Sequence, residues 1–595
     1  MKRPLADDSQ WSSLAAQQVD SANTFHHNES EMTTTRRDLM SALFASGWGG
    51  FLLEGAAADV RNPDWIKALA ERHDKGVESL LQRQITDKAN PHCGIFPDAT
   101  ELYQPSTASG ILDTYNTAFH HPLSKFHKNP LMIERMRLAA DYLNRVQTPD
   151  GNIDNIITNW NSPPDTAFTV LGVARVANIA KKASSQDVLQ MVTPFLDKAG
   201  KSLARGGVHT PNHRWVVCSA LALLNEVYPN PAYVKRVNQW LAEGIDIDED
   251  GQFDERSTIV YSPIVDIALI TVAAKLGKKE LLEPVRKNLD LNFYLMHADG
   301  EMVTEISHRQ DRNQVGDMGS YWFPMHYMAL HDNNPRYAWV AQKYLAQRAG
   351  LSLLLEYPEL TKPLPQPVAP PDNYEKVFKS LGIARIRRGD RSATLLLEED
   401  SRFFTLHHGG IAINAVRFAS AFFGKAQFEP QSWTKDGDSY VFRQSMSGPY
   451  YQPLENPYHV KAGEWGSSRK GRKQTEVSFL EQRATVTETA NGFRIRMQAT
   501  GTSNVPLAVE VSIRGKDGLE MDGLLAAPGV TDGFVLPTGY ARVRAGGKEI
   551  RFGPGRGEHK YTQVRGAEAK LPGASVYITG YTPFDHTLEF VCASA

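Results

Sequence analysis

The spacing of apolar residues changes once along the chain, and this change limits the fold more than any other sequence feature. Before the Pro-rich segment Leu360 to Pro371, apolar residues recur every three or four positions, and after it they alternate. The first spacing predicts helices and the second predicts strands. The fold class is therefore predicted to be α+β and multidomain, with a helical part followed by a β part.

Nine helices are predicted in the first part, over residues 65–84, 131–147, 165–182, 185–202, 215–227, 232–243, 263–276, 279–292 and 335–355. The stretch Ile85 to Gly110 is predicted to be a long loop. Short loops rich in Pro, Gly, Asn and Asp separate the other helices, and short connections make neighbouring helices antiparallel. A toroid of helical hairpins, a spiral bundle and a helical solenoid share this pattern, so periodicity leaves the three open.

The predicted strands lie at 393–398, 474–481, 492–499, 507–513 and 588–592, with Gly-containing turns between them. Many short strands of this kind predict an antiparallel β-sandwich. The predicted organisation is a head at residues 1–58, a helical domain at 59–357, a Pro-rich linker at 358–374 and a β-domain at 375–595.

The head contains an arginine pair, Arg36-Arg37, followed by a weakly hydrophobic run from Leu39 to Leu53 and by three alanines. This pattern resembles a bacterial twin-arginine export signal, and the alternative is a disordered polar head with a chance arginine pair. The run is too short and Gly-rich to span a bilayer. The head predicts a periplasmic or secreted protein that begins near Asp59, without membrane insertion.

Composition and motifs exclude several classes of protein. The chain has 65 basic and 67 acidic residues, so the basic surplus of a nucleic-acid-binding protein is absent. Cys93, Cys218 and Cys592 are distant and odd in number, which gives no disulfide framework or CxxC site. The sequence has no Walker loop, HExxH, GxSxG or strand-linked GxGxxG motif.

Ionisable residues gather instead in four short segments. Asn212-His213 opens an apolar helix, with Asn212 as the predicted N-cap. An acidic turn that begins at Asp250-Gly251 leads to Tyr261, the segment Glu305 to Asn313 is strongly polar, and His407-His408 precedes two glycines. For Glu305 to Asn313, a solvated loop with ion pairs is an equal alternative to a functional site.

An Asn-His pair at a helix start, followed about fifty residues later by the pattern DGxFxExSxxxY, resembles the heparinase II/III-like and alginate-lyase-like polysaccharide lyases. Here the pattern runs from Asp250 to Tyr261, with weaker support from His407-His408. The resemblance covers residues of about 63 to 595. It implies an N-terminal incomplete α/α toroid followed by a C-terminal antiparallel β-sandwich, and a β-eliminative lyase.

The resemblance also implies roles for particular residues. Asn212 and His213 would neutralise a uronate carboxylate, Tyr261 would act as base, acid or both, and His408 would join them as a catalytic residue. A free phenol has a pKa of about 10, so a tyrosine base needs nearby cations; Arg309 is one candidate. The predicted substrate-binding residues are Asn159, Trp160, Arg214, Glu255, Arg256, His308, Arg312 and His407.

No cofactor is required by this chemistry, and no residue is predicted to be a metal ligand. Asp246, Asp248 and Asp250 match the first half of a calcium loop, but Ser257 stands where the closing glutamate belongs. His407 and His408 alone supply too few ligands for zinc. A structural zinc or calcium ion therefore stays an open alternative.

Two other functions remain open from the sequence. A glycoside hydrolase on the same helical toroid would use paired carboxylates such as Asp254, Glu255 or Glu305. A non-catalytic carbohydrate-binding protein would leave His213 and Tyr261 without a common role. The predicted partner in the leading hypothesis is a uronate-containing polysaccharide or oligosaccharide; the sequence specifies neither the polymer nor the oligomeric state.

Overall fold

The computed structural model of the chain describes residues 64–594 except Glu399, residues 456–464, Lys516, Asp522 and Leu524. The predicted head with Arg36-Arg37 lies outside the described residues. The chain forms two compact units: one holds the residues up to Asp290 together with Thr304–Ala369, and the other holds Leu291–Val303 and Pro370–Ala595. Within the described residues, no helix has both the length and the apolarity that crossing a membrane requires.

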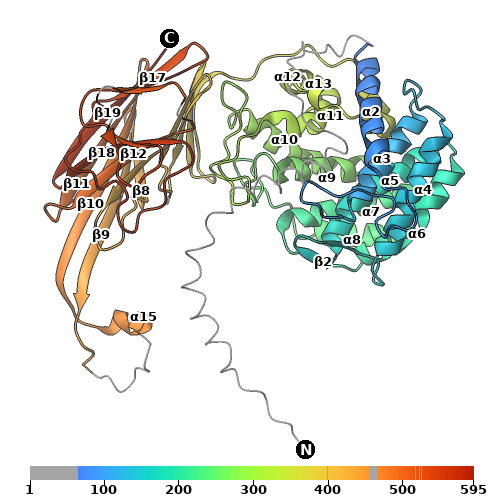
Figure 1. Cartoon of the computed structure of the whole chain (residues 1–595), viewed down its shortest axis with the longest axis horizontal. Coiled ribbons are helices and arrows are strands. Elements are labelled where there is room, and N and C mark those ends of the chain that lie inside the picture. Colours follow the sequence, from blue (N-terminus) through green and yellow to red (C-terminus); the bar gives the residue numbers. More distant parts are fainter. Residues whose placement is uncertain are drawn as a thin grey trace, which may run out of the picture. The chain divides into compact units, whose positions relative to one another are not determined.

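The first unit is almost entirely helical (Figure 1). Its α-helices are α2 (Asp64–Arg83), α3 (Thr107–His120), α4 (Pro130–Val146), α5 (Pro163–Lys182), α6 (Gln186–Leu203), α7 (Pro211–Val227), α8 (Pro231–Leu241), α9 (Tyr261–Leu276), α10 (Leu282–Asn292), α11 (Trp322–Asp332), α12 (Pro335–Lys343), α13 (Leu345–Arg348) and α14 (Leu351–Glu356). Three short 3₁₀ helices, η2 (Lys279–Leu281), η3 (Met318–Tyr321) and η4 (Pro358–Thr361), and a two-stranded ribbon, β1 (Ile153–Asn155) with β2 (Asn159–Ser162), complete it.

The helices of this unit alternate between an inner and an outer layer. Helices α3, α5, α7, α9 and α11 pack each against the next, while α4, α6 and α8 pack on their outer side. Helix α7 is buried over most of its length and α9 is apolar all round, whereas α8 buries only Tyr233 and Val237. A helix that is apolar on every side belongs in an interior, and a two-faced helix belongs at the surface. This alternation is that of a toroid of helical hairpins.

The helix predictions were wrong in several details. Helices α3 and α11 were not predicted, and the start of α3 overlaps the expected loop. The helix expected over 335–355 is broken into α12, α13 and α14, and Gly350 has an extended backbone (φ −108°, ψ 128°) before α14. Helix α9 begins at Tyr261 instead of Pro263. Pro263 is tolerated in the first turn because the N–H groups of that turn make no intrahelical hydrogen bond.

The second unit is built from strands (Figure 1). They are β3 (Asn373–Phe378), β4 (Ile383–Arg388), β5 (Arg391–Leu396), β6 (Phe404–His408), β7 (Ile411–Ser420), β8 (Ser432–Asp436), β9 (Ser439–Tyr451), β10 (Gln474–Thr489), β11 (Gly492–Gly501), β12 (Pro506–Ile513), β13 (Leu519–Met521), β14 (Leu525–Ala526), β15 (Gly533–Val535), β16 (Ala541–Ala545), β17 (Lys548–Gly553), β18 (Ala574–Tyr581) and β19 (Phe584–Ser594). A short helix, α15 (Trp465–Ser468), and a 3₁₀ turn at Arg469–Gly471 lie between β9 and β10.

These strands form two sheets, ordered β13-β16-β17-β19-β11-β10-β9-β8 and β14-β15-β18-β12-β7-β6-β5-β4-β3. Among the described residues the pairing is antiparallel, except that β15 runs parallel to β18. One apolar core joins the sheets: Phe404 of β6 packs against Phe493 of β11, with ring centroids 5.2 Å apart. The predicted order of helices followed by an antiparallel β-sandwich is confirmed.

A segment from the helical half of the sequence also belongs to the second unit. The carbonyl oxygen of Tyr294 accepts hydrogen bonds from Arg385 Nε (2.9 Å) and Tyr374 Oη (3.0 Å). Leu291–Val303 thus packs with strands that follow it by about eighty residues or more. The sequence-based boundary at 357/358 did not predict this excursion.

Candidate active site

The start of α7 holds Asn212 and His213 in buried positions. Thr210 is the N-cap, with an extended backbone (φ −138°, ψ 155°), and Pro211 is the first helical residue. The prediction that Asn212 caps the helix was therefore wrong, since proline is favoured at the first helical position and displaces it. Asn212 and His213 keep only 1% and 7% of their surfaces exposed.

Tyr261 is held at the start of α9 by a tight turn. Arg256 has a left-handed backbone (φ 51°), which reverses the chain, and Ser257 Oγ accepts a hydrogen bond from the backbone N–H of Tyr261 at 3.0 Å. The amide of Ser262 donates to the carbonyl of Ser257 at 2.9 Å. These bonds fix the backbone at Tyr261, and the residue is 4% exposed.

A continuous series of contacts connects Asn212 to Tyr261. Asn212 Nδ2 donates to Glu255 Oε2 at 2.6 Å, and Glu255 Oε1 lies 3.7 Å from Arg309 Nε. The Arg309 guanidinium carbon lies 5.0 Å from the centroid of the Tyr261 ring. Gln310 Nε2 donates to the hydroxyl of Tyr261 at 2.7 Å. Five side chains from three segments of the first unit therefore form one polar cluster.

The side chain of His213 is a neutral imidazole at pH 7. Burial lowers its pKa to about 4, with a further lowering by His209 and Arg309, while Asp165 acts in the opposite direction. Its Nδ1 is buried and has no hydrogen-bond partner among the described residues. At neutral pH this side chain is uncharged, so it has one ring nitrogen for accepting a proton and another for donating a hydrogen bond.

Glu255 orients the amide of Asn212. Burial raises the pKa of the Glu255 carboxyl, and the bond from Asn212 and the charge of Arg309 oppose this effect. The nitrogen of Asn212 donates to Glu255 and, at 3.3 Å, to Thr210 Oγ1. In this arrangement the amide binds a substrate carboxylate only by exchanging one of these bonds. The predicted role of Glu255 in substrate binding is untested.

The polar segment after Thr304 is tied to the turn before Tyr261. The buried Asp311 accepts hydrogen bonds from the Ser307 hydroxyl and from the backbone N–H of Ile259, the latter at 3.3 Å. The backbone N–H of His308 donates to the carbonyl of Glu255 at 3.1 Å. The two loops are therefore fixed to each other, which brings Arg309 and Gln310 to Tyr261.

Of the residues predicted in this segment, His308 and Arg312 are exposed. Burial and the charge of Arg256 lower the pKa of His308. Gln310 was missed as a site residue, and its signal was only its place in the dense polar run. The substrate-binding roles of Arg256, His308 and Arg312 stay predictions.

Asn159 and Trp160 lie on β2, beside the start of α5. Asn159 Nδ2 donates to Asp165 Oδ2 at 2.8 Å. The charge of Asp165 partly opposes the lowering of the His213 pKa. Trp160 is 69% exposed. Asp165 was missed by sequence reasoning, and the substrate-binding roles of Asn159 and Trp160 stay predictions.

Arg214 is engaged elsewhere. Its guanidinium nitrogens lie 3.0 Å from carboxylate oxygens of both Glu243 and Asp246. Its guanidinium carbon lies 4.7 Å from the centroid of the Trp215 ring. Arg309, the cation proposed for the tyrosine, has its guanidinium over the Tyr261 ring. The substrate-binding role of Arg214 remains untested.

His407 and His408 lie at the end of β6, in the second unit. His407 stacks face to face on His297, with ring centroids 3.6 Å apart and planes 7° from parallel. Burial lowers its pKa well below the ordinary range. His408 Nε2 lies 3.0 Å from the carbonyl oxygen of Ala593. Their catalytic and substrate-binding roles stay predictions.

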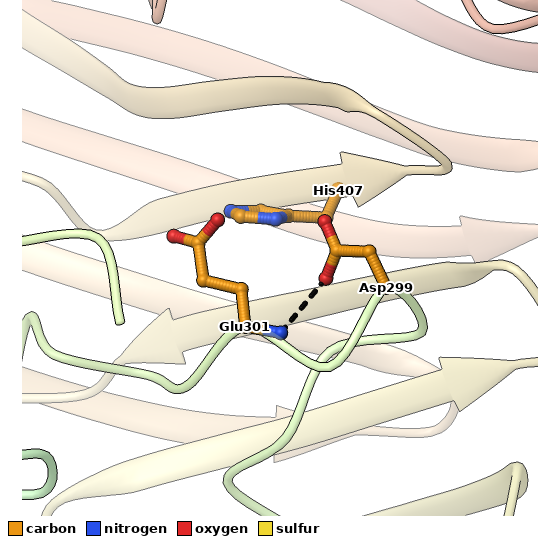
Figure 2. Close-up of side chains that lie close together, drawn as sticks. All are labelled: Asp299, Glu301 and His407. Atoms are coloured by element: carbon orange, nitrogen blue, oxygen red, sulfur yellow. Dashed lines mark hydrogen bonds between the residues drawn. The ribbon is translucent and has the colours of Figure 1, made fainter. Parts of the chain in front are cut away.

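One group in the described part of the chain brings together residue types that bind metals: Asp299, Glu301 and His407 (Figure 2). One ligand atom of each lies within 4.8 Å of the others. The Glu301 carboxylate is already bound by both terminal nitrogens of Arg514, at 2.5 and 2.7 Å, and Asp299 accepts the N–H of Glu301 at 3.0 Å. The charge of the Glu301 carboxylate is therefore already paired with an arginine.

The acidic turn that matches half a calcium loop binds protein N–H groups. Asp248 Oδ1 accepts from the amides of Gly251 (2.8 Å) and Gln252 (2.9 Å). Asp246 Oδ1 accepts from Trp215 Nε1 at 2.7 Å. These bonds hold the turn that precedes Tyr261.

Solved structures resemble this chain in fold. Chondroitin AC lyase of Streptomyces coelicolor A3 has a TM-score of 0.53 at 12% identity, covering 95% of this chain and 83% of that chain. Xanthan lyase of Paenibacillus has a TM-score of 0.56 at 10% identity, covering 96% of this chain and 60% of that longer chain. The chain has a polysaccharide-lyase fold. No protein-family model and no curated protein sequence matches it.

Proposed function

We propose that this chain is a polysaccharide lyase that cleaves a uronate-containing polysaccharide or oligosaccharide by β-elimination. Two findings support the proposal: the lyase fold, and the polar cluster around Tyr261. The observation that carries it is the pair of groups on the phenol, with Arg309 above the ring and Gln310 donating to the hydroxyl.

The first requirement of elimination is charge neutralisation. The C5 proton of a uronate is weakly acidic, so its removal needs hydrogen-bond donors or a cation at the adjacent carboxylate. Asn212, His213 and Arg309 supply these. Asn212 exchanges its bond to Glu255 for one to the substrate, and the neutral His213 donates from one ring nitrogen. The burial of Asn212 and His213 strengthens their interactions because water is excluded.

The second requirement is a base and an acid. Tyr261 Oη removes the C5 proton, while Gln310 and Arg309 stabilise negative charge on the phenolic oxygen. The electrons of the C5–H bond form a C4–C5 double bond, and the C4–O4 bond breaks. The leaving O4 takes a proton, which Tyr261 is able to return. For the opposite C5 epimer, His213 is the alternative base.

A hydrolase would use two carboxyls across the scissile bond and add water. In this structure both oxygens of Glu255 face protein groups, Asn212 and Arg309, and Glu305 accepts the backbone N–H of Thr304 at 3.0 Å. These contacts leave neither carboxylate free of protein partners. The chemical nature of the cleavage products distinguishes elimination from hydrolysis. Elimination leaves an unsaturated uronate that absorbs ultraviolet light, and hydrolysis leaves a saturated sugar.

The test is incubation of the full chain with a panel of uronate polymers, such as alginate, hyaluronan, chondroitin sulfate, heparan sulfate and a glucuronan. Ultraviolet absorbance and product mass are followed together. Absorbance that rises with chain cleavage supports the lyase. Cleavage without absorbance and with water added to the products would support the hydrolase, and sugar binding without any cleavage would support the non-catalytic alternative.

The location of the protein belongs to the same proposal. We propose that it acts in the periplasm or outside the cell, because Arg36-Arg37 and the apolar run after them resemble a twin-arginine signal. A polymer substrate that does not enter cells is consistent with this location.

A further inference from the structure

Strands β9 and β10 continue together beyond the rest of their sheet (Figure 1). Neighbouring β8 pairs with β9 no further than Arg443, and β11 pairs with β10 only from Leu480. Beyond these points, among the described residues, the two strands pair with each other, and one further backbone bond, from Thr502 N–H to Phe479 O at 2.8 Å, lies at the base. We call residues 447–455 and 465–479 the arm. An isolated two-stranded ribbon is marginally stable in water, so such an extension calls for a reason.

The arm exposes large aromatic side chains. Tyr450, Trp465 and Phe479 are 60%, 53% and 59% exposed. The Trp465 ring lies edge-on to Tyr451, with centroids 6.4 Å apart. Exposed aromatic rings that gather on one ribbon indicate a binding surface, whereas single exposed apolar residues are ordinary.

Cations lie among these rings. The guanidinium carbon of Arg472 lies 4.2 Å from the Trp465 ring centroid, and that of Arg469 lies 5.7 Å from Tyr451. Lys470 and Lys473 fall within the same five residues. The arm thus combines ring faces with a concentrated positive charge.

These cations differ from the other exposed arginines of the same sheet. Arg494, Arg496 and Arg544 each have a carboxylate partner, at 3.2, 2.5 and 2.8 Å. In the described part of the chain, Arg469 and Lys470 form no ion pair, and the guanidinium of Arg472 donates to Gln452 O and Ser468 Oγ, both at 3.3 Å. Within the described residues, the side chains of Arg469, Lys470 and Arg472 therefore have no carboxylate partner.

The edges of the arm resist pairing with another strand. Pro449 removes an N–H from β9, and β10 has a bulge between Thr475 and Ser478, where Glu476 has a left-handed backbone (φ 44°). Prolines, bulges and cations are the features that keep edge strands from joining. In a two-fold dimer of arms, moreover, the same cations would meet each other. These features disfavour a second copy of the chain as the occupant.

We propose that the arm is a second, non-catalytic binding site for an anionic polysaccharide. Trp465 and Tyr450 offer flat faces to sugar rings, and Arg469, Lys470 and Arg472 pair with the carboxylates or sulfates of the polymer. Arginine binds such groups through two parallel hydrogen bonds. The choice of a uronate polymer rests on the proposed function, and the site itself rests on the charge and the rings of the arm.

The test measures binding separately from turnover. Full-length Tyr261→Phe protein, in which polymer cleavage is expected to be slow, is run by affinity electrophoresis through gels that contain alginate, hyaluronan, chondroitin sulfate or heparan sulfate. Trp465→Ala and the double variant Arg469→Ser/Lys470→Ser are compared with Lys560→Ser, which removes an exposed cation outside the arm. The arm variants are expected to bind at least one polymer about fivefold more weakly, a usual scale for exposed ion pairs, and Lys560→Ser to bind as the parent does.

Two outcomes would overturn the proposal. One is equal retention of the parent and both arm variants in every gel, with circular dichroism showing that all are folded. The other is a dimer in analytical ultracentrifugation that the arm variants abolish while polymer binding is unchanged. If arm-dependent binding is found but no chain is cleaved by wild-type protein, the arm proposal stands and the proposed lyase function fails.

Discussion

Among single residues, Arg309 connects two of the predicted catalytic side chains, Tyr261 and His213. Its guanidinium carbon lies 5.0 Å from the centroid of the Tyr261 ring, and its charge contributes to the lowered pKa of His213. Arg309→Gln is expected to lower turnover by about a hundredfold, because a preorganised donor is lost where charge develops. Arg205→Gln, at an exposed arginine of the same unit, is the control and should keep the parental rate. Equal rates for the two variants would remove Arg309 from the mechanism.

His213 makes stability depend on pH. Burial lowers its pKa to about 4, whereas an unfolded histidine has a pKa of about 6.5. Between these values the unfolded chain binds a proton that the folded chain does not, so stability falls as the pH falls from about 6.5 to about 4. His213→Gln should lessen this fall by about 2 to 3 kcal/mol, as measured by denaturant unfolding at pH 7 and pH 4.5. An unchanged pH dependence would show that the imidazole is not held neutral.

The sequence pointed to only part of this cluster. Asn212, His213 and Tyr261 were predicted from a family motif. The parts of this motif lie at helix starts, which short-range sequence signals can indicate. Gln310 reaches Tyr261 across 49 positions of sequence, through loops that side-chain hydrogen bonds hold together. Such a contact is decided by tertiary structure, so neither residue type nor spacing could reveal it.

Among the larger elements, the two loops before Tyr261 and after Thr304 act as a unit through Asp311. Asp311→Ala leaves the Ser307 hydroxyl and the Ile259 N–H without their acceptor, which is expected to cost about 1 to 3 kcal/mol. It should also lower turnover at least tenfold, since Arg309 and Gln310 lose their support. Asp197→Ala on α6, which breaks an exposed ion pair, should change stability by under about 0.5 kcal/mol. Wild-type turnover of a folded Asp311→Ala protein would contradict this account.

The helices also show where periodicity works and where it fails. Helices α4 and α6 have one buried face, and their predicted limits lie within two residues of the structure. Helix α3 has polar residues such as Asp113 and Asn116 buried beside apolar ones, so the sequence has no apolar stripe to recognise. Interior helices of a toroid contact neighbours on several sides, which erases the pattern that predicts them.

Over the whole molecule, the change of period and the Pro-rich segment were enough to predict helices followed by a β-sandwich. They could not predict that Leu291–Val303 packs with the strands, because the segment is short and its contacts are with residues that follow much later. The choice of a toroid likewise needed the alternation of inner and outer helices. Local pattern predicts the elements, and packing decides their arrangement.

The export proposal also concerns the whole molecule. Replacing Arg36-Arg37 with two lysines should keep the protein inside the cell, because twin-arginine transport depends on that pair. Fractionation of the native cell, with an antibody against the β unit, measures this. The mature protein is expected to begin near Asp59. An intact amino terminus on exported protein, or export of the Lys-Lys variant at the parental level, would contradict the signal.

The central claim is that Tyr261 performs proton transfer in an elimination. The most direct measurement is the initial rate of ultraviolet absorbance from unsaturated product, on whichever uronate polymer the wild-type protein cleaves, for Tyr261→Phe beside Tyr228→Phe. Tyr228 is the matched control, since its hydroxyl bonds Thr193 at 2.6 Å at the other end of α7. Tyr261→Phe should be about a hundredfold slower or more, with an unchanged fold, and Tyr228→Phe should cleave at close to the parental rate. A Tyr261→Phe protein that forms unsaturated product at the wild-type rate would contradict the account.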